Sequence, residues 1–254
     1  MSNWIGFATI VRREFKRTMM TINQVVWPPV ITTLLFLFIF GVGLGSTLRQ
    51  MDGVPYVQFL LPGLVMLNVI ASSYDEAASS LFQQRFQLSI QELLIAPLSD
   101  LELLLGYLTG SILRGIVIGA LIMLLGLLVV HLEPRHGLVL FYFMFVTALL
   151  FSSVGMIGAL LAKTFDNLAI VTTFFITPLT YVGGVFSSIQ ILPPIVHQAS
   201  LFNPMLYMVD GLRFGYIGRS DVSPLIDATI VTLLAVAAFI IAFWMVHRGV
   251  NLRV

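Results

Sequence analysis

Residues 230–244 read IVTLLAVAAFIIAFW, a run of fifteen residues without a charged side chain. A second such run, ITTLLFLFIFGVGLG, covers residues 31–45. Both runs are continuously apolar, which favours membrane-spanning helices over the alternating segments of about 10 residues that build closed β-barrels. Of the 254 residues, 58% are hydrophobic and only 10% are charged, against about 25% charged in soluble domains. We therefore expect an all-α polytopic membrane protein.

Six stretches are long enough to span a bilayer, which takes about 20 helical residues. They are Trp27–Thr47, Tyr56–Ser79, Leu103–Val130, Leu138–Ala162, Leu168–Ser187 and Leu225–Val246. The chain 1–254 is thus interpreted as a single transmembrane domain. Its parts are an interfacial helix (1–26), spans one to five (27–187), an outer connection (188–224), span six (225–247) and a tail (248–254).

The first 26 residues predict an amphipathic helix, because their apolar residues recur at steps of three and four. These are Trp4, Phe7, Ala8, Val11, Phe15, Met19 and Ile22. Arg13, Lys16 and Arg17 lie largely off this face, which favours a helix in the membrane interface with its basic side toward the headgroups. An extension of soluble helix is the alternative. Pro28 and Pro29 suit the first turn of the first span, where a missing N–H costs little.

The basic residues predict the orientation. With the N-terminus inside, eight basic residues fall in inside segments and four in outside segments, and Arg114 lies within a span. The inside set is Arg12, Arg13, Lys16, Arg17, Arg85, Lys163, Arg248 and Arg253, and the outside set is Arg49, Arg135, Arg213 and Arg219. The positive-inside rule then places both termini in the cytoplasm. The net charge of +1 argues against nucleic acid as a partner.

Residues 91–100, QELLIAPLSD, interrupt the apolar sequence. In this orientation the connection Leu81–Glu102 is cytoplasmic. Pro97 should end a short helix at about the preceding residue, and Ser99 should cap the next helix. The segment is either a turn between spans or a contact surface, and its length and capping favour the contact surface.

The outer connection 188–224 is too apolar for a solvated loop. Pro193–Pro194 and Asn203–Pro204 divide it into two helical pieces that are too short to span. Irregular backbone at membrane depth is tolerated only where it is buried in protein or lines a cavity, so we expect a re-entrant helical hairpin. Asp210 and Arg213, three residues apart, are placed for a local ion pair.

Three ionisable residues fall within or at the ends of spans: Asp75, Glu76 and Arg114. Ionisable groups in a membrane indicate function by default. The two acids could instead reach headgroup water, and Arg114 could extend to the interface. A specific pair between Arg114 and a carboxylate remains the other possibility.

Several short stretches resemble the permease subunit of the type-2 ABC exporter family. PMLYMVDGLR at 204–213 has the family's proline, aromatic residue and arginine at the expected spacing. LFN at 201–203, FSSIQILPP at 186–194 and QELLIAPLS at 91–99 resemble family stretches in the same order. One departure is QLSIQE at 87–92, which is neutral where many members have charged residues before the glutamate.

This resemblance implies one half of an exporter, working as a homodimer with two separate ATPase subunits that bind ATP and Mg. The chain itself has no GxxxxGK[ST] loop, so we expect no cofactor in it. The interfacial helix and residues 83–98 would form the ATPase platform, with Arg85 and Glu92 as polar contacts and Pro97 as a rigid stop. The outer gate implied by the family motif would comprise Asn203, Pro204, Tyr207, Asp210 and Arg213.

Two other classes of membrane protein are alternatives to an exporter permease. An intramembrane enzyme would need a catalytic constellation, and the sequence has no HExxH motif and no cysteine. A channel or secondary carrier would show polar midplane groups or two repeated halves, and no internal repeat is found. The expected localisation is the inner cell membrane. The expected cargo is amphipathic, lipid-linked or drug-like.

Overall fold

A computed structural model describes residues 4–40, 50–51 and 53–252 of the chain. The N-terminal half contains α1 (Trp4–Met20), α2 (Ile22–Phe38), β1 (Gln50–Met51), β2 (Val54–Pro55), α3 (Tyr56–Phe86), α4 (Ile90–Ile95) and α5 (Asp100–Val130). The rest contains α6 (Gly137–Leu161), α7 (Phe165–Val171), η2 (Thr172–Ile176), α8 (Thr177–Thr180), η3 (Tyr181–Val185), η4 (Ile189–Ile191), α9 (Pro194–Leu201), α10 (Pro204–Ile217) and α11 (Pro224–His247).

The described residues contain five helical stretches that are long and apolar enough to cross a membrane, or up to six if the bent pair α1–α2 counts as one. This confirms the all-α polytopic fold. The predicted span starting at Tyr56 begins at that residue, and the predicted spans three, four and six match α5, α6 and α11 within about three residues at each end. The first predicted span extends past residue 40 into residues outside the described part.

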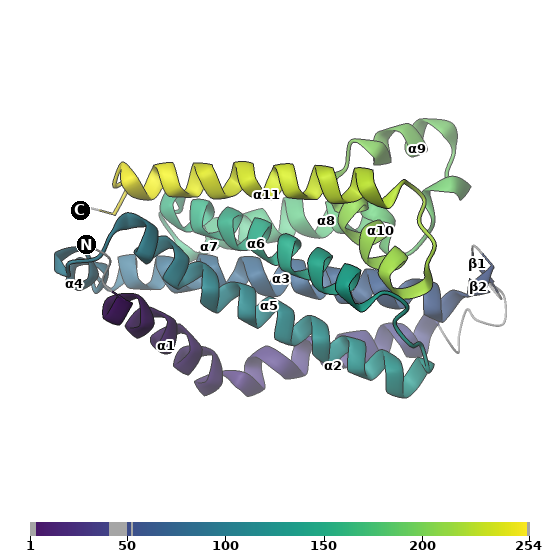
Figure 1. Ribbon diagram of the computed structural model, residues 1–254, viewed down its shortest axis with the longest axis horizontal. Helices are drawn as coiled ribbons and strands as arrows, with labels where there is room; N and C mark the ends of the chain where they lie inside the picture. Colours follow the sequence, from purple (N-terminus) through teal and green to yellow (C-terminus); the bar gives the residue numbers. More distant parts are fainter. Residues whose placement is uncertain (1–3, 41–49, 52, 253–254) are drawn as a thin grey trace.

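The bundle has two distinct ends (Figure 1). α4, the start of α1 and the end of α11 lie together, and we call this the terminal end. The β1–β2 hairpin and α9 lie at the opposite end, the hairpin end (Figure 1). Both ends of the described chain are therefore on one side of the bundle, as an even number of spans requires.

α3 is the central helix, with 78% of its most apolar window buried. It packs mainly against α5 and α6. Gly155 lets the backbones of α3 and α6 approach closely, because a β-carbon there would lie 2.6 Å from the carbonyl oxygen of Tyr74. Small residues at helix interfaces let backbones approach in this way. The packing of the helices around α3 fixes where its polar residues point.

α1 and α2 meet at a 60° bend. The prediction for Pro28 and Pro29 was wrong: both lie inside α2, which already begins at Ile22. α1 buries Ile10 and Glu14 against the bundle, whereas the large apolar residues Trp4 and Phe15 are exposed. The side of α1 that carries Ile10 and Glu14 thus faces the protein, and much of its apolar face is available to lipid.

The fifth span is continuous from Phe165 to Val185 but irregular. It includes two π-helical stretches, η2 and η3, and Gly184 in η3 has a φ of +83°. That left-handed conformation suits glycine because it has no side chain. The carbonyl oxygen of Gly184 accepts a hydrogen bond from Arg213, which joins the end of this span to α10.

Candidate functional site

α4 is a short helix at the terminal end. Ile90 anchors it in the core, while Glu92 is exposed and the Ile95 side chain is 85% exposed. Ala96 is extended, so the helix ends just before Pro97 as the sequence predicts. The segment is shorter than expected, because α3 continues to Phe86 and already includes residues 83–86 of the predicted platform.

The restart after α4 is capped. Ser99 Oγ accepts the N–H of Glu102, and the Glu102 carboxylate accepts the N–H of Ser99 at 2.8 Å. This reciprocal capping box begins α5 and satisfies two N–H groups at the helix start. The predicted role of Ser99 as a cap is confirmed.

A groove beside α4 brings Glu92 to the same surface as α1. Its lining includes Arg13, Lys16 and Arg17 of α1 and Gln84 near the end of α3. A carboxylate and three basic side chains therefore border one polar depression. Residues of α1 and α4 thus line one groove at the terminal end.

Arg85 has a different environment from Glu92. Its Nε donates to the carbonyl oxygen of Asn251 at 2.8 Å, and its Nη1 donates to the carbonyl oxygens of Ala159 and Ala162. It thereby satisfies acceptors at the C-terminal end of α6, where cations are favourable. The structure places Arg85 as a tie between α3, α6 and the chain after α11.

An ionic cluster joins α1, α3 and α5 within the bundle. Glu76 of α3 is only 2% exposed and lies between two arginines. Arg17 Nη2 of α1 is 2.6 Å from Glu76 Oε1, and Arg114 of α5 contacts Oε2. Thr18 also donates to Oε1 at 3.0 Å. The possibility of an Arg114–carboxylate pair is confirmed, and Glu76 does not reach headgroup water.

Glu14 extends the ionic cluster along α1. It accepts from Ser80 of α3 at 2.6 Å and pairs with Arg13 at 3.0 Å. Arg17 Nε lies 3.5 Å from the same carboxylate. The expectation that the basic face of this helix turns toward headgroups was therefore wrong for Arg13 and Arg17, because buried acids attract them into the bundle.

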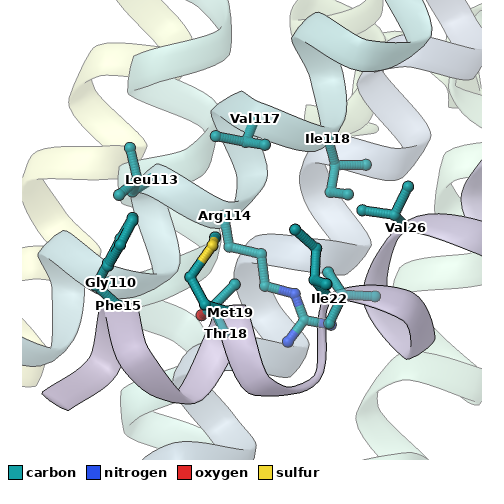
Figure 2. Close-up of a pocket in the computed structure, with 11 residues that line it drawn as sticks. Phe15, Thr18, Met19, Ile22, Val26, Gly110, Leu113, Arg114, Val117 and Ile118 are labelled. Carbon is teal, nitrogen blue, oxygen red and sulfur yellow. The ribbon is translucent and has the colours of Figure 1, made fainter.

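A small pocket lies beside the ionic cluster, at the bend between α1 and α2 (Figure 2). Arg114 points into it from α5, and Thr18 adds a second polar group. The other lining residues have no polar side chain: Phe15, Met19, Ile22, Val25, Val26, Gly110, Leu113, Val117 and Ile118.

Asp75, next to Glu76, has a separate position. It is exposed on the surface of α3, and its carboxylate accepts a hydrogen bond from Thr172 of η2 at 3.3 Å. No ion pair in the described part of the chain includes it. The two adjacent acids thus separate, one into the ionic cluster and one onto the protomer surface.

At the hairpin end, α10 is almost entirely buried and packs against α3, α6 and α11. Arg213 is 2% exposed, and its guanidinium lies 3.9 Å above the ring of Phe59. Its Nη1 is 3.6 Å from Asp210 and 3.9 Å from Asp221. The predicted pairing of Asp210 with Arg213 is confirmed.

Asp210 also organises the turn that leads into α11. Its two oxygens accept the backbone N–H groups of Asp221 and Val222 at 2.9 and 2.8 Å. Asp221 in turn accepts from the Ser188 hydroxyl at 2.7 Å. The α10 helix is therefore linked through Asp221 to the turn before α11 and to Ser188 in the segment before η4.

The remaining motif residues shape the start of α10. Asn203 caps the helix by accepting the N–H of Met205 at 3.0 Å and donates to the carbonyl oxygen of Leu179 at 2.6 Å. Pro204 is the first helical residue, where its missing N–H costs little. Tyr207 donates to the carbonyl oxygen of Leu201 at 2.6 Å and so closes the turn between α9 and α10.

The sequence interpretation missed Glu14 and Asp221. Glu14 is a lone acid among four basic residues, and that isolation was the available signal. Asp221 lies in GRSDVSP, at 218–224, which has the composition of an ordinary exposed turn. Glu14 bonds to Ser80 and Asp221 to Ser188, and these distant partners become apparent only in the packed structure.

These features define a polytopic helical membrane protein with buried charged clusters toward both ends of its bundle. The family model for the ABC-2 type transporter matches residues 6–217, and the chain belongs to this family. It is 39% identical over 251 residues to the inner membrane transport permease YadH of Escherichia coli K12, covering 98% of both chains. Nodulation protein J of Rhizobium leguminosarum bv. viciae is 23% identical over 218 residues, covering 84% of this chain and 83% of that protein.

Proposed function

We propose that this chain is the membrane-spanning subunit of an ATP-driven exporter. In this proposal two copies form a homodimer around the translocation path, and two separate ATPase subunits bind ATP and Mg. Membership of the ABC-2 family supports a transport role. The ATPase requirement, the copy number and the export direction are the parts that the proposal adds.

The surface of α4 is the observation that supports this function most directly. Ile95 is 85% exposed at the end of α4, which stops just before Pro97, and Leu94 beside it is also exposed. Exposed apolar side chains rimmed by polar groups mark protein contact sites. Glu92 and the basic residues of α1 supply that rim, so an ATPase can seat on the platform of α1 and α4.

The ionic cluster gives the platform a route into the bundle. α1 is tied to α3 through Glu76, and Glu76 is tied to α5 through Arg114. In the proposed mechanism ATP-driven closure of the two ATPases displaces α4 and α1, and the ionic cluster carries that movement to α3 and α5. Such a change between two packed arrangements needs no covalent step in this chain.

The proposed location is the inner membrane with both termini cytoplasmic. The charge count of eight inside against four outside supports the orientation, and the name of YadH supports the membrane. The hairpin end lacks a large folded domain in the described residues, since its elements are the short β1, β2, η4 and α9. An amphipathic, lipid-linked or drug-like cargo leaving through the membrane fits that architecture.

A matched pair of substitutions tests the platform. Ile95→Asp on α4 and Ile195→Asp on α9 change side chains that are 85% and 84% exposed at opposite ends of the bundle. The permease would be purified with a candidate ATPase subunit and assayed in proteoliposomes for binding and ATP-dependent transport. We expect Ile95→Asp to weaken ATPase binding at least tenfold and Ile195→Asp to leave it unchanged. Transport without any ATPase would instead establish a channel or secondary carrier.

A further inference from the structure

α3 has one stripe that the rest of the protomer leaves uncovered. Leu67, Ala71, Asp75 and Ser79 follow each other at steps of four and therefore share one helical face. Leu67, Ala71 and Ser79 are half-buried. Within Tyr56–Phe82, all of which the structure describes, Asp75 is the one exposed residue. The central helix α3 thus reaches the protomer surface at a carboxylate.

The Asp75 carboxylate lies between the two ends of the bundle, not at either end. It is eleven residues before the end of α3, which corresponds to about 16 Å of helix. At the same level Tyr74 packs against Gly155 of α6, which is still six residues, about 9 Å, before that helix ends. Ionisable side chains within a membrane span face protein or a water-filled cavity, because lipid cannot solvate them, and Asp75 falls within the predicted span Tyr56–Ser79.

No ion pair among the described residues includes Asp75. Arg114 acts on the charge of Asp75 electrostatically, but Arg114 and Arg17 form their ion pairs with the neighbouring Glu76. Among the described residues its hydrogen-bond donor is the Thr172 hydroxyl. A carboxylate can accept more bonds than this one. Thr172 also begins the π-helical stretch η2, a type of distortion that is frequent at functional sites.

We infer that Asp75 lines the water-filled translocation path and selects cargo that bears a positive charge. This inference rests on the proposed function, in which the uncovered stripe of α3 faces the second copy across the path. Phe174 and Phe175 lie two and three residues after Thr172 in η2. Both rings are exposed and offer apolar contact. The site therefore combines one negative group with aromatic surface, which suits an amphipathic cation.

Charge-selective thiol labelling tests the inference without knowledge of the cargo. The chain has no cysteine, so Ala71→Cys and Ser79→Cys introduce single thiols one turn to either side of Asp75. Inside-out membrane vesicles would be treated with a trimethylammonium methanethiosulfonate and with the sulfonate reagent of similar size. Each rate is divided by the rate of the same reagent with a small thiol in solution. Leu233→Cys, on the exposed face of α11, is the control for a position outside the path.

We expect both stripe positions to react and Leu233→Cys to remain unreactive. A unit charge about 6 Å away in water at physiological salt changes the cation-to-anion rate ratio by about threefold to tenfold. The ratio should fall by that factor when Asp75→Asn is added and stay high with Asp75→Glu, which retains the charge. The Glu variant also shows whether any change at this position disturbs folding.

Two results would overturn the inference. Unreactive thiols at both 71 and 79 would mean that lipid or a second copy covers the stripe. A ratio unaffected by Asp75→Asn would mean that the path does not select cations. Labelling needs no ATPase, so the inference about Asp75 can stand even if the Ile95→Asp experiment shows that no ATPase binds.

Discussion

Nη2 of Arg17 lies 2.6 Å from Oε1 of Glu76, and this pair joins the first helix of the chain to the central helix of the bundle. Arg114 contacts the other carboxylate oxygen, so the same acid connects three helices. The ionic cluster thus contains a nearly inaccessible carboxylate, whereas Arg17 and Arg114 remain 30% and 18% exposed. Removing the acid should therefore affect α1, α3 and α5 together.

Glu76→Gln is predicted to destabilise the permease by about 3 kcal/mol, the lower end of the cost of breaking a buried ion pair from one side. The amide keeps the shape of the side chain but leaves two arginines uncompensated. Thermal unfolding in detergent measures the effect. Glu92→Gln is the control, because Glu92 is exposed and its substitution should leave the midpoint unchanged. Equal midpoints for both variants would show that the ionic cluster does not hold the three helices together.

The spans were predictable because each is a continuous apolar run, and lipid requires a helix there. The end of α4 and the start of α5 were predictable because Pro97 and the Ser99 cap act through their own neighbours. Asn203 and Pro204 likewise mark the start of α10 by local rules. These features depend on residues within four positions of each other, which a sequence displays directly.

The direction of the charged side chains was not predictable in the same way. Helical periodicity shows that Arg17 lies off the apolar face, but it does not show that Glu76, fifty-nine residues later, packs against it. The separation of Asp75 from Glu76 depends on how α5 and η2 pack around α3. Tertiary contacts over such distances require the folded structure.

Gly211→Ala is predicted to destabilise the outer part of the bundle by about 1–3 kcal/mol, the usual cost of overpacking. A β-carbon at this position of α10 would lie 2.1 Å from the ring of Phe143 on α6. Gly137→Ala is the matched control, since a β-carbon there meets nothing within 4 Å. Thermal unfolding of the two variants should differ in midpoint, and a wild-type midpoint for Gly211→Ala would mean that α10 is loosely packed.

The proposed topology predicts opposite labelling of two exposed glutamines. Gln87 follows α3 at the terminal end, and Gln198 lies on α9 at the hairpin end. A membrane-impermeant thiol reagent should label Gln198→Cys but not Gln87→Cys in intact cells, and the reverse should hold in inside-out vesicles. Ser200 is buried and would be a poor reporter. Labelling of Gln87→Cys in intact cells would reverse the orientation derived from the basic residues.

Arg213→Ala is predicted to destabilise the permease by about 3–5 kcal/mol or to block transport, because it leaves Asp210 and Asp221 without a nearby cation. The substitution also removes the hydrogen bond from Arg213 to the carbonyl oxygen of Gly184 and the contact of the guanidinium with the ring of Phe59. Arg135→Ala, an exposed arginine at the same end, should cost about 0–1 kcal/mol.

The charge and the packing contributions of Arg213 separate in a double variant. Asp210→Asn with Arg213→Gln removes both charges of the close pair and should recover part of the stability lost in Arg213→Ala, because less charge remains unpaired. Recovery cannot be complete, since Asp221 stays charged and the NH2 group of an amide at position 210 cannot accept one of the two N–H groups, of Asp221 and Val222, that the carboxylate oxygens of Asp210 accept. Unfolding midpoints in detergent and transport in vesicles measure both variants. Wild-type behaviour of Arg213→Ala in both assays would show that α10 neither depends on the pair nor gates the outer exit through it.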